Sequence, residues 1–179
     1  MKKLFLILVV VFSLMLVPVE RVLAQDVAMA QAIAMAPVSA TIIIPLTATE
    51  ASQLNFGRFY PGEQGGTIVI SPSGLVMTSS TVVPDASPKS PGSFFVSGEV
   101  DATYSIAIPR GPSTLTNADA TKTMEVTDWV TLPGNGDPGI RLAGGSQTVM
   151  VGATLKVGTM NENPKGIYRG SYEITFAYN

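Results

Sequence analysis

From Thr41 onward, the sequence alternates between short runs of β-branched and aromatic residues and clusters of Gly, Pro, Ser, Asn and Asp. This spacing is typical of antiparallel sandwiches and barrels, in which tight turns join short strands. Residues that repeat with a helical period are nearly absent there. We therefore predict an all-β domain, an antiparallel β-sandwich of about seven to eight strands.

Two predicted strands show the pattern most clearly. In Ser171–Tyr178, aromatic and aliphatic residues occupy every second position from Tyr172, and Gln147–Gly158 alternates in the same way. A period of two places one row of side chains on a core and the other row toward water. The turn residues 161–166 between the two strands favour a hairpin. The predicted strands are Thr41–Leu46, Thr67–Ser71, Leu75–Val83, Ser93–Gly98, Thr103–Pro109, Thr123–Thr131, Gln147–Gly158 and Ser171–Tyr178.

The first residues predict export. Lys2 and Lys3 precede an apolar run over Leu4–Val17, which is short for a membrane span, and Ala24 precedes Gln25 in the pattern that signal peptidase cleaves. An uncleaved anchor helix is the alternative. The prediction divides the chain into a signal peptide (1–24), an N-terminal extension (25–39) and a β-sandwich domain (40–179).

The charge of the exported chain argues against two classes of partner. Cleavage would remove three of the 11 basic and one of the 13 acidic residues, which leaves a net charge of about −4. A mildly acidic chain without a basic cluster lacks the features that attract nucleic acid or anionic lipid. We expect a secreted protein of the periplasm or the extracellular surface, with no nucleic-acid partner and no integral membrane span after cleavage. Because the chain has no Cys, its stability must come from burial and sheet hydrogen bonds.

The residue types that most often perform catalysis are missing. The sequence has no His and no Cys, so the commonest general base and the thiolate nucleophile are absent. Glu99 and Asp101 share a strand face if that strand continues, and we expect them to be solvated carboxylates at a turn rather than an acid/base pair. Asn135 and Asp137 lie among glycines without the spacing of a calcium loop. We predict no enzyme, no cofactor and no metal site.

Two aromatic residues are candidates for contact with a ligand. By strict alternation, Trp129 lies on the face of Thr127 and Thr131, opposite Val130, and would be exposed. Together with Tyr104 it could then stack on a sugar ring. We favour a half-buried packing role for Trp129 over exposure, since large aromatic side chains contribute most of their energy by burial.

Several fragments in a fixed order resemble a bacterial family of secreted β-sandwich proteins that is known only as a domain of unknown function. That family is similar to spore coat protein U and to chaperone–usher pilin domains, which implies an incomplete immunoglobulin-like (pilin-like) sandwich that assembles by strand exchange. Gly166 and Tyr178 correspond to a glycine and a penultimate tyrosine of pilin C-terminal strands; the pilin cysteine pair is missing. The fragments are 40–46, 54–57, 66–72, 93–99, 102–106, 155–158 and 170–178.

The resemblance implies a non-catalytic structural or assembly subunit of the cell surface, pilin-like or coat-like. Its partners would be further copies of the chain or a periplasmic chaperone, bound through strand pairing. A surface adhesin or glycan-binding module is the alternative. In the extension, Val27, Met29, Ile33 and Met35 alternate with Ala, and we predict that this row enters a neighbouring subunit as a strand. A short helix or a mobile leader remain alternatives for the same residues.

Overall fold

The computed structural model describes residues 32–79, 81–118, 121–134, 137 and 139–179. The predicted signal peptide, Val27 and Met29 lie outside the described residues. Thr41–Asn179 forms one compact unit, and residues 32–40 belong to a separate unit in which they have no regular secondary structure. Within the described ranges, no helix has the length and apolarity needed to cross a membrane.

The compact unit consists of short strands joined by turns, with a single 3₁₀ turn, η1 (Ala143–Gly145). The strands are β1 (Thr47–Ser52), β2 (Phe59–Tyr60), β3 (Gly66–Ile70), β4 (Val76–Thr78), β5 (Val83–Pro84), β6 (Gly92–Ser97), β7 (Thr103–Ala107), β8 (Ser113–Asn117), β9 (Thr123–Leu132), β10 (Ile140–Arg141), β11 (Ser146–Val157), β12 (Tyr168–Arg169) and β13 (Thr175–Tyr178).

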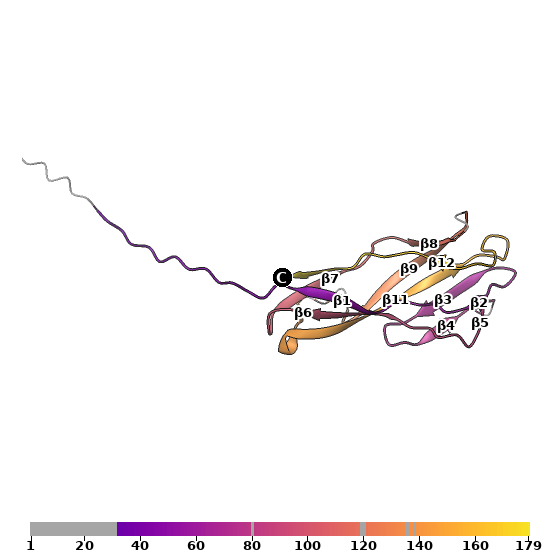
Figure 1. The fold of residues 1–179 in the computed structure, drawn as a ribbon, viewed down its shortest axis with the longest axis horizontal. Helices are drawn as coiled ribbons and strands as arrows, with labels where there is room; N and C mark the ends of the chain where they lie inside the picture. The colour runs from indigo at the N-terminus through magenta and orange to yellow at the C-terminus, as the bar shows by residue number, and fades with distance from the viewer. Residues whose placement is uncertain (1–31, 80, 119–120, 135–136, 138) are drawn as a thin grey trace, which may run out of the picture. The chain divides into compact units, whose positions relative to one another are not determined.

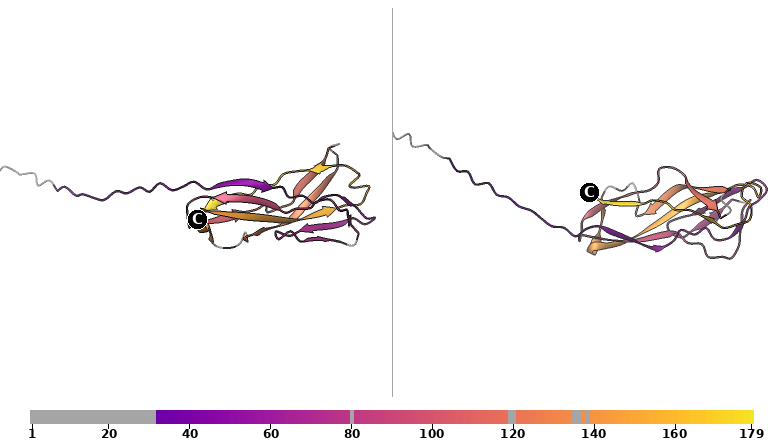
Figure 2. Two further views of the ribbon diagram at one scale, coloured as in Figure 1. Left: turned by 60° about the horizontal axis from the view of Figure 1, so that its bottom comes forward. Right: turned by 45° about the horizontal axis from the view of Figure 1, so that its top comes forward.

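Two main antiparallel sheets contain most of these strands. The larger sheet has eight strands in the order β1-β6-β11-β9-β8-β12, with β3 paired to β11 and β4 paired to β3. The smaller sheet has the order β10-β7-β13, and β2 pairs with β5 separately. The long strand β11 runs through the middle of the larger sheet (Figure 1), and the views in Figure 2 show β13 in the other layer.

The hydrophobic core lies between the two sheets. One cluster joins Val96 and Val149 of the larger sheet to Tyr104, Ile106 and Ile140 of the smaller sheet. A second cluster is built mainly from the larger sheet and includes Trp129, and partly buried side chains from the loop after β7 and from the C-terminal segment pack against it. Side chains from both layers therefore fill one interior, and the all-β antiparallel sandwich predicted from the alternation is confirmed.

The prediction for Thr41–Leu46 is wrong, because the first strand begins at Thr47. Residues 41–45 are exposed and have no ladder partner, and Pro45 has no N–H to donate. The β-branched run there has the composition of a strand, but it does not pair with another strand among the described residues.

The predicted hairpin is also wrong. β13 pairs with β7, whereas β11 pairs with β3, β6 and β9. The turn residues 161–166 lead instead into β12, which pairs with β8. The predicted strand Leu75–Val83 is divided between β4 and β5, and Ser171–Tyr178 is a strand only from Thr175.

Candidate functional site

Among the described residues, no strand neighbours the outer edge of β13. β7 pairs with β13 through the register Phe176↔Ile106 and Tyr178↔Tyr104, and the smaller sheet ends at β13. The Asn179 N–H donates to the Thr103 carbonyl at 3.1 Å, a distance typical of ladder hydrogen bonds. Hydrogen-bonded and non-hydrogen-bonded pairs alternate in an antiparallel ladder. The main-chain groups of Phe176 and Tyr178 therefore point away from β7, where no described residue bonds them.

The side chains of the C-terminal segment are only partly buried although they face the core. Tyr172, Ile174, Phe176 and Tyr178 all pack against core residues and all remain half-buried. The Phe176 ring lies 5.9 Å from the ring of Phe94, centroid to centroid. These apolar side chains line the side of the sandwich at which the smaller sheet ends, which we call the open side.

The Tyr178 hydroxyl connects three segments at one end of the open side. It donates to the Ile44 carbonyl at 2.8 Å and accepts from the Glu99 N–H at 2.6 Å. The Glu99 carboxylate in turn accepts from the Ile44 N–H at 2.9 Å. A side chain at Gly98 would collide with the Tyr178 hydroxyl. This end of β13 is therefore held to the residues that precede β1.

At the other end, the Tyr172 ring is packed into the core. It lies 4.5 Å from the Trp129 ring, centroid to centroid, and its hydroxyl faces Gly92. The Tyr172 hydroxyl and Trp129 Nε1 are buried without a hydrogen-bond partner among the described residues. Burial, with a smaller contribution from the Glu50 carboxylate, raises the pKa of Tyr172 to about 12.

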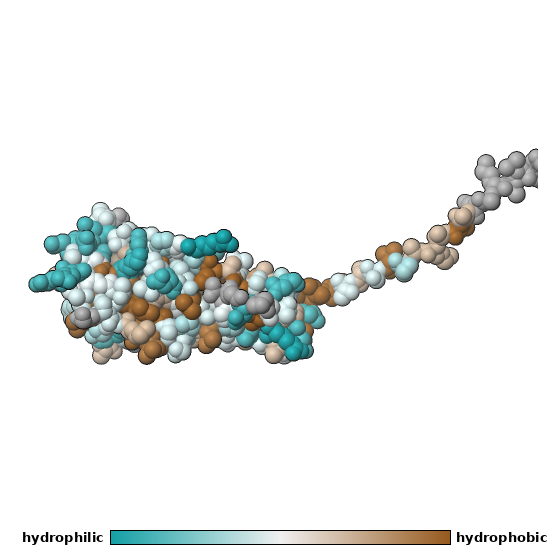
Figure 3. Space-filling view, turned by 180° about the vertical axis from the view of Figure 1, so that it is seen from behind, coloured by the Kyte–Doolittle hydropathy of each residue, from teal (hydrophilic) through white to brown (hydrophobic). Residues whose placement is uncertain are grey.

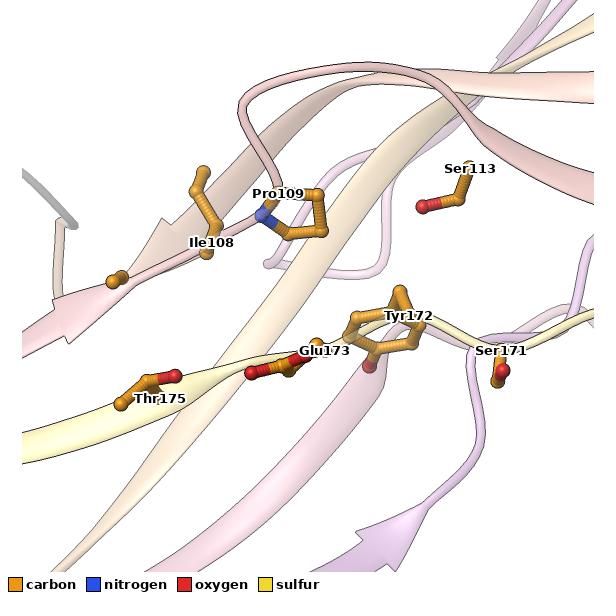
Figure 4. Close-up of a pocket in the computed structure, with 8 residues that line it drawn as sticks. Ile108, Pro109, Ser113, Ser171, Tyr172, Glu173 and Thr175 are labelled. Atoms are coloured by element: carbon orange, nitrogen blue, oxygen red, sulfur yellow. The ribbon is translucent and has the colours of Figure 1, made fainter.

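A shallow hollow borders this segment (Figure 4). Ile108 and Pro109 line it from the loop after β7, and Tyr172, Glu173 and Thr175 line it from the C-terminal segment. No described hydroxyl near it is hydrogen-bonded to a carboxylate that would activate it. The hollow marks the place where the C-terminal segment separates from the neighbouring strands.

The predicted exposure of the two candidate ligand-binding aromatics is wrong, whereas the packing role favoured for Trp129 is confirmed. Trp129 is 9% exposed and Tyr104 is fully buried, and the two belong to different core clusters. The Tyr104 hydroxyl donates to Gln147 at 2.9 Å. Asp128 adopts a φ of 49°, and the register between β9 and β11 shifts beside it. This bulge turns Trp129 inward and leaves Val130 48% exposed, because one extra residue exchanges the two faces of a strand.

The two predicted turn carboxylates do not form a pair. Glu99 bonds the Ile44 N–H, whereas Asp101 lies 3.1 Å from the Arg141 guanidinium. The expectation of turn residues fits this arrangement, since the Ala102 N–H donates to the Glu99 carbonyl. Among the described residues, no three His, Cys, Asp or Glu side chains gather as metal ligands. Asn135 lies outside the described residues, and Asp137 accepts from the Gly134 N–H at 3.1 Å.

Gly166 and Tyr178, which the resemblance placed in one strand, lie in different surroundings. Gly166 precedes β12 and lies against the Asn117 side chain at the end of β8. Tyr178 lies on β13 opposite Tyr104. Only Tyr178 belongs to the open side.

The described part of the N-terminal extension is apolar and exposed. Ile33, Met35 and Val38 are 80%, 96% and 95% exposed, and Ile42 is 99% exposed. No charged residue occurs from 27 to 44. Figure 3 accordingly shows brown and pale residues along this segment and none of the saturated teal of the sandwich surface. An exposed apolar segment without charge is a feature of interaction surfaces.

The resemblance implied an incomplete sandwich, but sequence reasoning did not place its open edge at β13. Alternation in 172–178 indicates which side chains face the core, but it does not reveal how many neighbouring strands cover them. Aromatic residues at three of the four inward positions were the available signal. The chemistry of the site is main-chain hydrogen bonding and apolar contact.

The fold and this edge define an all-β sandwich with one side left open. Residues 46–178 match the family described as Domain of unknown function (DUF4402), and the chain belongs to that family. No curated protein matches the sequence.

Proposed function

We propose that the chain is a secreted, non-catalytic structural subunit of the bacterial surface that assembles with further copies through strand pairing. The observation that carries this proposal is the exposed apolar segment at Ile33, Met35 and Val38, next along the chain to a sandwich with an unpaired edge. Burial of such side chains contributes about 1.5–3 kcal/mol each, which favours association. The absence of His and Cys is consistent with a non-catalytic role.

The order of the strands supports an immunoglobulin-like interpretation of the sandwich. Immunoglobulin constant domains have strands A-B-E-D in one sheet and C-F-G in the other. With β1, β6, β7, β9, β11 and β13 taken as A to F, the larger sheet gives A-B-E-D and the smaller sheet gives C-F. In this assignment the last strand, G, is the one without a counterpart. Its place beside F corresponds to the open side.

Export is tested by fractionation and mass spectrometry of the protein made in a bacterial host. We expect the chain outside the cytoplasm with Gln25 at its N-terminus. Retention of Met1 on the exported protein would contradict cleavage of the signal peptide.

Assembly is tested by sedimentation velocity of the mature chain over a range of concentrations. The variant Ile33→Asp/Met35→Asp should raise the concentration needed for half-association by roughly a hundredfold, because two apolar contacts are lost. The matched control Ala34→Asp/Ala36→Asp adds the same charge to the same segment without removing a large apolar side chain, and should have a smaller effect. A mature chain that stays monomeric at all concentrations would contradict the proposal.

A further inference from the structure

We propose that residues 32–36 of a second copy pair with the open edge of β13 and supply the strand that the smaller sheet lacks. This inference rests on the proposed function and adds to it the accepting edge, the donated residues and their register. The unpaired N–H groups of Phe176 and Tyr178 would donate hydrogen bonds to the added strand, and their carbonyls would accept hydrogen bonds from it.

Among the edges within the described residues, only two belong to longer strands that have a fully free side, β1 and β13. The other edge strands are β2, β4, β5, β10 and β12, which have two or three residues each. Short edge strands offer little for a further strand to pair with. The choice of acceptor is therefore between β1 and β13.

β1 is a poor acceptor because it has no large apolar side chains to cover. Its sequence is Thr-Ala-Thr-Glu-Ala-Ser, and its first five residues are exposed. A strand added beside it would bury small and polar groups, and Glu50 would lose hydration. Beside β13, the added strand would cover the half-buried Ile174, Phe176 and Tyr178. Burial of apolar area therefore favours the β13 edge.

The donated residues match this edge in length and pattern. Ala32–Ala36 spans five residues, as does Thr175–Asn179. If Ile33 and Met35 face the core, as Phe176 and Tyr178 do, the alanines face outward. In a parallel arrangement Ile33 lies opposite Phe176 and Met35 lies opposite Tyr178, and in an antiparallel arrangement these partners are exchanged. Ala34 lies opposite Ala177 in both.

The donor is a second copy because the same chain would have to reverse direction abruptly. Ile44 is held at the Tyr178 end of β13 by the hydroxyl–carbonyl bond of 2.8 Å. Residues 37–43, which join the donated segment to Ile44, contain Pro37 but no Gly, Asn or Asp, and they end in Thr41-Ile42-Ile43. β-Branched residues are poorly suited to a tight turn, in which Gly, Asn and Asp predominate. A segment from another molecule needs no such turn.

The absence of native Cys allows a direct test by cross-linking. One full-length mature chain carries Ala34→Cys and another carries Ala177→Cys, and the two are mixed and oxidised mildly. Directly opposed residues lie within the Cα separation that a disulfide requires. We expect the mixed disulfide to form at least about tenfold faster than in two control mixtures. The first control pairs Met35→Cys with Ala177→Cys, which face opposite sides, and the second pairs Ala34→Cys with Thr49→Cys on β1.

Each other outcome contradicts a specific part of the inference. Equal or faster reaction with Thr49→Cys would show that β1 is the acceptor. If a single chain carrying both Ala34→Cys and Ala177→Cys closes an internal disulfide at high dilution, the donor is the same molecule. Assembly in sedimentation without preferential cross-linking would overturn this inference and leave the proposed function intact. A chain that neither assembles nor cross-links would overturn both.

Discussion

β11 and β13 have the same alternating sequence pattern but lie at different depths. The inward residues Val149, Val151 and Leu155 of β11 are at most 1% exposed, whereas Phe176 and Tyr178 of β13 remain half-buried. β11 has paired strands on both edges, and β13 has one on a single edge. Alternation therefore determines which face of a strand meets the core, and the number of neighbouring strands determines how completely that face is covered.

The largest effect is expected in β11. Leu155→Ala should lower the free energy of unfolding by about 2–5 kcal/mol, because the side chain is 1% exposed and its removal leaves a cavity. Urea denaturation of the monomeric protein measures this loss. Phe176→Ala provides the comparison on β13, where the ring is only partly buried and its truncation should cost less than that of a fully buried Phe. If Phe176→Ala lowered the free energy of unfolding as much as expected for a fully buried Phe, the side chains of β13 would be fully covered in the monomer, which contradicts an open side.

A second effect sharpens the comparison at the Tyr172 end of the open side. Gly92→Ala would place a methyl group 2.6 Å from the Tyr172 hydroxyl, and we expect a loss of about 1–3 kcal/mol in unfolding free energy. Tyr172→Phe in the same chain should restore part of the loss, since it removes the colliding oxygen.

The matched control is Gly111→Ala, where nothing lies within 4 Å of the added methyl group. That substitution should be neutral or slightly stabilising, because it restricts the unfolded chain. A Gly92→Ala protein as stable as Gly111→Ala would mean that Tyr172 does not occupy this position in the core.

A smaller effect is expected where the Tyr178 hydroxyl joins Ile44 to Glu99. Tyr178→Phe removes both hydrogen bonds, and we expect a loss of about 1–2 kcal/mol in thermal or urea unfolding. Tyr60→Phe is the control, because Tyr60 is 62% exposed. Similar stabilities of the two variants would contradict a structural role for the Tyr178 hydroxyl.

The smallest effect concerns alkaline pH. The pKa of Tyr172 is raised to about 12, whereas an unfolded tyrosine titrates near about 10. The unfolded state therefore loses its proton first, and stability is full below about pH 10 and declines as the pH rises toward 12. Melting temperatures between these values should fall less steeply in Tyr172→Phe. The residual slope would include Tyr104, whose pKa burial also raises. An unchanged slope would show that Tyr172 titrates normally.

The sequence was sufficient for the class of fold and for the inward faces of β11 and β13, because both depend on a period of two. It was insufficient for Trp129, because the bulge at Asp128 shifts the alternation by one residue and no local signal marks it. The run Thr41–Ile44 has strand composition without a strand partner among the described residues. β8, with the sequence Ser-Thr-Leu-Thr-Asn, was missed because a single Leu makes no apolar row. The open edge depends on long-range pairing, which local patterns do not encode.

The central claim is that one side of the sandwich is open along β13, and amide hydrogen exchange of the dilute, monomeric mature chain tests it most directly. Ala177, which lies in a hydrogen-bonded pair with β7, should exchange slowly, whereas the amides of Phe176 and Tyr178 should exchange at least about tenfold faster. On assembly, all three should become protected. Equal protection of Phe176, Ala177 and Tyr178 in the monomer would contradict the account.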